Sequence, residues 1–246
     1  MARDKDSSAV DSLEASLLSL IRLIVSRDQN EVVRRLTASP QLASAALSAG
    51  ATRTNSTEYF LTEISHYAYA GDTPLHLAAA AYQTAIAAIL LQRGAKAGAR
   101  NRRGAEPLHY AADGAPGSKY WNPAAQSAVI EVLIQSGANP NAADKSGVAP
   151  LHRAVRTRCS AAVKTLLLNG ADLHQNNGSG STALHLAVQT TGRGGSGTDA
   201  AREEQAAIIR LLLDRGARPT DRDSSGKTVL DCVKTDWIRG LLEKTS

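Results

Sequence analysis

Four segments of the chain are near-copies of one another: GDTPLHLAA, GAEPLHYAA, GVAPLHRAV and GSTALHLAV. They begin at Gly71, Gly104, Gly147 and Gly180, and a looser fifth copy, GKTVLDCV, begins at Gly226. A second landmark, Gly-Ala, follows an apolar run in each full copy, and the next copy always begins ten residues after its glycine. Variation in length therefore falls between the two landmarks, which is typical of repeated units that stack to bury one continuous core.

Each copy is predicted to contain two helices. The apolar residues before each Gly-Ala keep helical spacing, as in AIAAILLQRGA, and the glycine marks the C-terminal stop. Thr73 and Thr182 are suited to cap the first helix, and Pro74, Pro107 and Pro150 to occupy its first position. Only 4% of the residues are aromatic, so we expect a core of Leu, Ile, Val and Ala, which favours thin helix packing.

The 33-residue period, the T-P-L-H-x-A-A opening and the Gly-Ala landmark resemble the ankyrin repeat, as found in certain bacterial ankyrin proteins. The resemblance covers residues 71–246 and implies an all-α solenoid of helix-turn-helix pairs with β-finger turns. The repeats are placed at 71–103, 104–146, 147–179, 180–225 and 226–246, and the last is truncated like a C-terminal cap. Departures from the pattern are Glu106 and Ala149 at the Thr position, Ala183 and Val229 at the Pro position, and Asp231 at the His position.

Residues 1–70 are predicted to form a helical N-terminal cap followed by a lead-in segment. DSLEASLLSLIRLIVS and DQNEVVRRLTASP have the pattern of two amphipathic helices. A solenoid needs such a cap because each unit buries its apolar face only against a neighbour. The lead-in is aromatic, and two interpretations stay open: packing of the rings in the core, or contact with a partner through Tyr69. The aromatic and imidazole side chains of the lead-in are Tyr59, Phe60, His66, Tyr67 and Tyr69.

Gly192, Gly194 and Gly197 match G-x-G-x-x-G, the fingerprint of a dinucleotide site. Such a site requires a preceding strand within a βαβ unit, and a helix that receives the phosphate at its N-terminus. A predicted helix precedes this stretch instead. The insertion at 190–204 is therefore interpreted as a linker between two helices, and no cofactor is predicted.

The histidines of the repeats do not indicate a metal site. Each occupies one equivalent position, so neighbouring rings would stand on the order of 10 Å apart, the distance of packed helices. Zinc–ligand bonds are about 2 Å long. The resemblance implies that each imidazole ties a turn to a helix by hydrogen bonds. The four are His76, His109, His152 and His185.

No catalytic residues are predicted. Cys159 has no histidine and acid that the pattern places beside it, and the carboxylates are scattered along the repeats. We therefore expect a protein that is not an enzyme. An enzyme or effector activity carried by residues 1–70 stays open as an alternative.

The chain is expected to be a cytoplasmic monomer with no membrane contact. No stretch approaches the roughly 18 apolar residues of a membrane span. The two cysteines are too few for a disulfide framework, and Glu14 and Arg22 interrupt the first apolar segment, which favours an amphipathic helix over a signal peptide.

The resemblance implies a protein–protein interaction scaffold, with binding on a concave face of fingers and first helices. The residues expected there are Tyr69, Asp72, Arg102, Arg103, Asp113, Lys145, Arg153, Arg156, Gln189 and Lys227. The insertion at 113–123 adds Tyr120 and Trp121, which either contact a partner or fold back on the helices.

The charge of the chain is uneven, since residues 71–180 carry eleven Lys and Arg against six Asp and Glu, a net of +5. Arg102, Arg103, Lys145 and Arg156 are expected to face one side, with Arg153 joining them. Arginine forks on carboxylates then predict an acidic protein partner. A merely solvated basic face is one alternative. Nucleic acid is another, less favoured because the face lacks aromatic residues for stacking.

Overall fold

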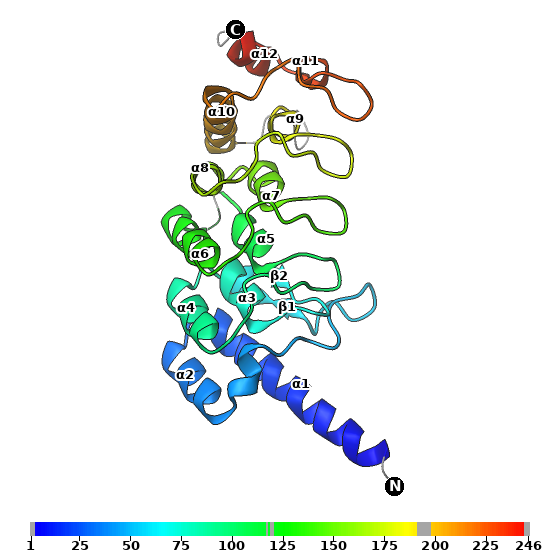
Figure 1. The fold of residues 1–246 in the computed structure, drawn as a ribbon, viewed down its shortest axis with the longest axis vertical. Coiled ribbons are helices and arrows are strands. Elements are labelled where there is room, and N and C mark those ends of the chain that lie inside the picture. The colour runs from blue at the N-terminus through cyan, green and yellow to red at the C-terminus, as the bar shows by residue number, and fades with distance from the viewer. Residues whose placement is uncertain (1–2, 117, 119–120, 191–197, 244–246) are drawn as a thin grey trace. The chain divides into compact units, whose positions relative to one another are not determined.

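A computed structural model of the chain describes residues 3–116, 118, 121–190 and 198–243. The described chain is an all-α solenoid built from helix pairs, as predicted (Figure 1). It divides into two compact units, Met1–Ala111 with Val132–Ala138, and Ala112–Glu131 with Asn139–Ser246. Helix α6 (Pro123–Gln135) contributes residues to each unit. The motif Gly192, Gly194 and Gly197 lies outside the described residues.

The first unit begins with the two helices predicted for the N-terminal segment. These are α1 (Arg3–Val25) and α2 (Gln29–Ala38), and they pack against each other. They cover the first repeat, since α1 packs on α3 (Pro74–Ala80) and α2 on α4 (Thr84–Gln92) (Figure 1). Helix α5 (Pro107–Ala112) follows. From Leu13 onward, where burial is described, the buried residues of α1 and α2 are Leu17, Leu20, Ile21, Ile24, Val25, Val32 and Leu36, all aliphatic as expected.

The lead-in segment forms a short antiparallel hairpin of β1 (Phe60–Leu61) and β2 (His66–Tyr67). A 3₁₀ turn at Pro40–Ala43 precedes the hairpin, and a second one, Thr62–Ile64, connects its two strands. The prediction that its rings pack in the core is right for Tyr59 and wrong for Phe60 and Tyr67. Tyr59 is 6% exposed, whereas Phe60 and Tyr67 are 37% and 38% exposed. The last two are cross-strand partners whose rings contact each other, with centroids 4.8 Å apart.

The second unit contains α7 (Pro150–Arg156), α8 (Ser160–Leu168), α9 (Ala183–Ala187) and α10 (Asp199–Asp214). Within this unit α7 packs on α9 and α8 on α10, so first helices form one layer and second helices another (Figure 1). The truncated repeat, α11 (Val229–Cys232) and α12 (Asp236–Glu243), closes that end, since α12 packs on α10 and buries Ile238 and Leu242. No helix of the described residues is long and apolar enough to cross a membrane.

The repeat histidines make the hydrogen bonds that the resemblance implied. His76 Nδ1 accepts from the backbone N–H of Thr73 at 3.1 Å, so its Nε2 carries the proton and donates to the carbonyl of Ala105, at 3.1 Å. One ring thereby caps its own helix and holds the next finger turn. The same pair of bonds recurs at His152, with Ala149 and Gln175, and at His185, with Thr182 and Lys227.

Glu106 stands where the first and fourth repeats have threonine, and its side chain is 6% exposed. Burial raises the pKa of the Glu106 carboxyl, and the neighbouring Arg100 guanidinium, whose Nε lies 3.1 Å from Glu106 Oε1, only partly opposes this. A raised pKa in the folded state means that the folded protein favours the neutral carboxylic acid. The charged form therefore costs stability above the ordinary pKa of 4.5.

Replacing Glu106 with glutamine, a neutral side chain of the same shape, is expected to raise the melting temperature at pH 7 by a few degrees. The gain should vanish near pH 4, because the glutamic acid is then neutral as well. Thermal unfolding followed by circular dichroism at both pH values measures it. Glu58→Gln, at an exposed position, is the control and should change neither value. A fall in melting temperature at pH 7 would contradict the prediction.

Candidate partner-binding surface

The four finger turns led by Gly104, Gly147, Gly180 and Gly226 are each closed by one side-chain acceptor at their first residue. Asn101 Oδ1 accepts from the backbone N–H groups of Arg103 and Ala105, at 2.9 and 3.0 Å. The leading glycine of the finger has positive φ, 76° at Gly104, as such a tight turn requires. Asp144, Asn177 and Asp223 close their fingers with the same two bonds. The shape of the finger is therefore set by its backbone and this one residue.

Neighbouring fingers touch through their backbones within each unit. In the first unit Arg102 N–H donates to the carbonyl of Ala70, at 2.9 Å. In the second unit Gly178 N–H donates to the carbonyl of Ser146, at 3.0 Å, and a Cβ on Gly178 would come within 2.4 Å of that oxygen. In the last finger the Ser224 hydroxyl also donates to the carbonyl of Ser179, at 2.6 Å. The side chains of Arg102, Arg103 and Lys145 take no part in such contacts and are exposed.

The finger tips and the ends of the first helices carry exposed basic side chains. Arg102 and Arg103 are exposed in the first unit, and Lys145 and Arg156 in the second. The guanidinium of Arg103 lies over the half-buried ring of Tyr69, 4.1 Å from its centroid. Gln189 and Lys227 are exposed as well.

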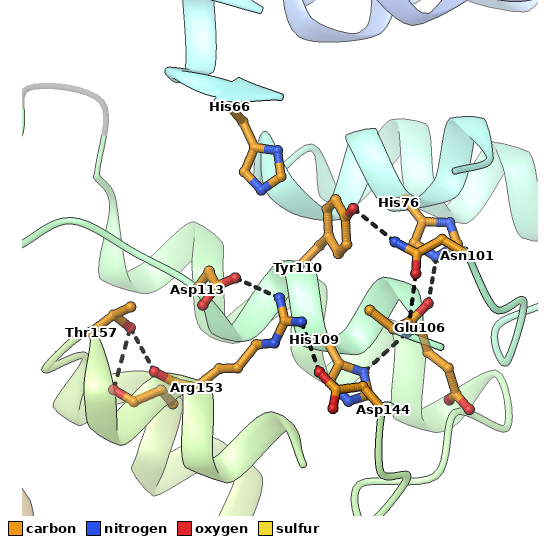
Figure 2. Close-up of polar contacts among 12 residues, drawn as sticks. His66, His76, Asn101, Glu106, His109, Tyr110, Asp113, Asp144, Arg153 and Thr157 are labelled. Carbon is orange, nitrogen blue, oxygen red and sulfur yellow. Dashed lines mark hydrogen bonds and ion pairs between the residues drawn. The ribbon is translucent and has the colours of Figure 1, made fainter. Parts of the chain in front are cut away.

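Asp72, predicted to be exposed for a partner, is fully buried. Its carboxylate accepts from Asn101 Nδ2 at 2.9 Å, from the Tyr110 hydroxyl at 2.8 and 2.9 Å, and from the backbone N–H of Tyr69 at 2.7 Å. Asn101 in turn donates to the hydroxyl oxygen of Tyr110 (Figure 2). The prediction was wrong because donors from the next finger and the next helix draw this carboxylate inward. Asp72 is thus a structural residue of the first unit.

Arg153, predicted to join the basic face, is held between two carboxylates of its own unit (Figure 2). Its Nη1 lies 2.9 Å from Asp113 and its Nη2 3.2 Å from Asp144, and its side chain is 19% exposed. Burial alone would lower the pKa of Arg153, but the two carboxylates more than offset this and raise it. Arg153 and Asp113 therefore satisfy each other's charge, and their role as contact residues stays a prediction.

Asp144 joins the finger turn to this ion pair. Burial tends to raise the pKa of its carboxyl, but the N–H groups of Val148 and Ser146, together with Arg153, outweigh burial and lower it. A carboxylate already holding three donors has little capacity for a further partner. The negative charge of Asp144 is therefore satisfied within the second unit.

Trp121 folds back on the molecule, which is the second of the two alternatives left open for it. The ring is half-buried, and its Nε1 donates to Gln126 Oε1 at 2.9 Å. A Cβ on Gly114 would meet Trp121 Nε1 at 3.0 Å, so the ring lies directly against this glycine. Tyr120, the other aromatic residue of the insertion, lies outside the described residues.

Two features of the structure went unpredicted. One is the pair of exposed rings on the hairpin, Phe60 and Tyr67. The other is a buried glutamine at the start of the second helices, eleven residues before the Gly-Ala glycine. Gln126 and Gln205 occupy this position, and each donates to a carbonyl that follows the first helix of its repeat. Their common spacing from Gly137 and Gly216 was a visible signal for this role.

Comparison with protein-family models gives two matches. The model described as ankyrin repeats in three copies matches residues 122–196, and the model described as the ankyrin repeat matches residues 70–102 and 179–224. Together the matches span more than half of the 246 residues. A search of curated proteins finds no match.

Replacing Tyr110 with phenylalanine is expected to destabilise the protein by about 1–3 kcal/mol, because the buried Asp72 carboxylate loses a donor. Urea unfolding measures the difference in free energy. Tyr67→Phe removes a hydroxyl from a 38% exposed ring and should stay within about 0.5 kcal/mol of the wild type. Equal stability of Tyr110→Phe and wild type would show that the hydroxyl does not support Asp72.

Replacing Arg153 with glutamine is expected to cost about 1–3 kcal/mol at pH 7, because two partly buried carboxylates lose their cation. The pKa of Asp144 is lowered by folding, so its contribution is present above its ordinary value of 3.8 and is lost as the pH falls below that value. The difference between the variant and wild type should therefore shrink near pH 3, in urea unfolding at both pH values.

Arg156→Gln is the matched control, since Arg156 is exposed and lies one helical turn further along α7. Its unfolding free energy should equal that of the wild type at both pH values. A pH-independent loss in Arg153→Gln would show that packing of the arginine stem, and not its charge, stabilises the unit.

Proposed function

The chain belongs to the ankyrin repeat family, whose repeats are generally protein–protein interaction modules, and we propose that it is a non-enzymatic scaffold for an acidic protein partner. Binding takes place on the finger tips and the adjoining ends of the first helices. The family relationship supports the general role, and the arrangement of charge on the fingers supports the acidic partner.

The observation that carries the proposal is the separation of charge on the fingers. The acidic groups Asp72 and Asp144 are satisfied inside their own units. Among the described residues no carboxylate lies within ion-pair distance of the exposed cations, which are Arg102, Arg103, Lys145 and Arg156. These cations therefore form no ion pair that stabilises the described fold, and they are available to carboxylates of a partner.

Of these cations, Arg103 has a side chain that is already ordered before a partner binds. Its guanidinium is 4.1 Å from the centre of the Tyr69 ring, an arrangement in which the cation is attracted to the ring face. A side chain that is already ordered loses less conformational entropy on binding, and guanidinium can form two parallel hydrogen bonds to one carboxylate. Tyr69 thus belongs to the proposed surface as the support of Arg103.

Cysteine chemistry is not part of the proposal. Burial raises the pKa of the Cys159 thiol to about 11, so that at neutral pH it is protonated and unreactive. Cys159 is fully buried and packs beside Gly114 and Thr157. We interpret it as a small core residue at the start of α8.

Reversing two charges in either unit is expected to weaken partner binding by about tenfold or more, since lost attraction is replaced by repulsion. One variant carries Arg102→Glu and Arg103→Glu, and a second carries Lys145→Glu and Arg156→Glu. The measurement is affinity capture from host lysate at physiological salt with mass spectrometry, followed by titration of the captured protein against both variants.

The control carries Lys164→Glu and Arg210→Glu, which make the same change of charge on exposed positions of the second helices α8 and α10. It should bind like the wild type. Equal binding by all variants would contradict the proposal and leave the basic fingers as a solvated surface. Loss of capture on nuclease treatment, with a steep fall in affinity between about 50 and 200 mM salt, would contradict it in favour of nucleic acid.

A further inference from the structure

The second unit contains a pocket of about 250 Å³ at the meeting point of α7, α9 and α10. Its apolar wall is formed by Val155, Leu186 and Ile208, and its polar lining includes Arg156, Arg158 and Gln205. Small-molecule sites usually measure roughly 300–1,000 Å³. This pocket is slightly smaller, which suits a single amino-acid residue better than a cofactor.

Arg158 is a buried arginine that forms no ion pair with a carboxylate of the described residues. The residue is 8% exposed, and its Nη2 has no hydrogen-bond partner among the described residues. Burial lowers the pKa of its guanidinium, and no charged group in the described part of the chain opposes this. The residue also has φ of 60°, in the left-handed region, in the turn between α7 and α8. The left-handed φ recurs at Tyr82, the equivalent position of the first repeat, so it belongs to the turn. The buried, unpartnered guanidinium is a cost to the fold, which therefore gives no reason for an arginine here.

Gln205 brings a second unsatisfied group to the same pocket. The residue is 2% exposed, and its Nε2 donates to the carbonyls of Ala187 and Gln189 at 2.7 and 3.1 Å. Its Oε1 is buried and has no donor among the described residues. In the second repeat the equivalent Gln126 Oε1 accepts from Trp121 Nε1. At Gln205 the corresponding donor is missing from the described chain.

The two groups define the chemistry of a ligand, because Arg158 needs an acceptor and Gln205 Oε1 needs a donor. An amino-acid residue that carries a carboxylate near an amide N–H supplies both. We propose that this pocket binds one such residue of a protein partner, with the carboxylate on Arg158, the N–H on Gln205 and the aliphatic stem against Val155, Leu186 and Ile208. The inference rests on the proposed function, for which it names an anchoring site.

The positive charge of Arg156 attracts anions toward this pocket. It is exposed and lies at the pocket, so its charge adds to the long-range attraction that brings a carboxylate in. Arg158, being buried, then acts at short range, where a charge-assisted hydrogen bond is shielded from water and correspondingly strong. The anchoring step thus depends on Arg158 more than on Arg156.

Two kinds of residue carry a carboxylate near an amide N–H, namely an acidic residue within a chain and a residue at a C-terminus. N-acetylglutamate N-methylamide represents the first and N-acetylleucine the second. N-acetylglutamine N-methylamide has the shape of the first without its charge. Each is titrated into the full-length ¹⁵N-labelled protein, and the side-chain NMR signals of Gln205 and Arg158 are followed.

We expect one of the two carboxylate probes to shift the Gln205 signals saturably, with a Kd on the order of 1–10 mM. The neutral probe should not, and Arg158→Gln should weaken binding at least tenfold. Arg158→Lys, which keeps the charge, should retain part of it, and Arg156→Gln should weaken binding only about two- to threefold. Unchanged backbone spectra away from the pocket establish that each variant is folded.

No saturable shift with either carboxylate probe, or equal binding by wild type and Arg158→Gln, would overturn the inference and leave Arg158 and Gln205 satisfied by each other or by solvent. Capture of a partner separates this result from the proposed function. A partner retained by Arg158→Gln but lost with the finger variants supports the scaffold and overturns the pocket. A pocket that binds the probe in a chain that captures no protein overturns the scaffold alone.

Discussion

The stacking within each unit depends on a neutral imidazole that makes two opposite hydrogen bonds. One nitrogen accepts from the N–H at the start of its own helix, and the other donates to a carbonyl of the next finger, as His76 does with Thr73 and Ala105. A protonated ring could not accept, so this arrangement requires the uncharged form. Burial provides for this at His152, where it lowers the pKa of the ring. The helices and the fingers are therefore held in register by a group that must stay uncharged.

Acidic and basic side chains are treated differently within each unit. Carboxylates that lie near the fingers are taken up by backbone N–H groups, amides and one arginine, as at Asp72 and Asp144. Cations at the tips have no such partners in the described chain and remain in solvent. The attraction for an acidic protein then has two sources: an excess of basic residues, and the internal hydrogen bonding of the carboxylates that would otherwise offset them. Arg158 extends this pattern from the surface into a pocket.

The repeats, their helices and the N-terminal pair could be predicted from the sequence because each rests on short-range patterns: helical spacing, a capping residue, a glycine stop. The direction of individual polar side chains could not. Asp72 occupies a position that the family leaves open to solvent, yet Tyr110, thirty-eight residues later in the chain, draws it inward. Arg153 was predicted to be part of the basic face, but in the structure its Nη1 lies 2.9 Å from Asp113, a residue of an insertion. Such outcomes depend on partners from different repeats, which no local pattern specifies.

The finger turns carry a consequence for how such a protein can change over evolutionary time. Four of the turns are closed by the acceptor at their first residue and by backbone bonds, as Asn101 does for Arg103 and Ala105. The side chains of tip residues such as Arg102 and Lys145 take no part in these bonds. Mutations at such exposed tip positions therefore change the stability of the fold little, and selection acts on them mainly through the binding of a partner. A lineage could exchange one partner for another through a few codons, while the hydrogen-bonded scaffold beneath is inherited intact.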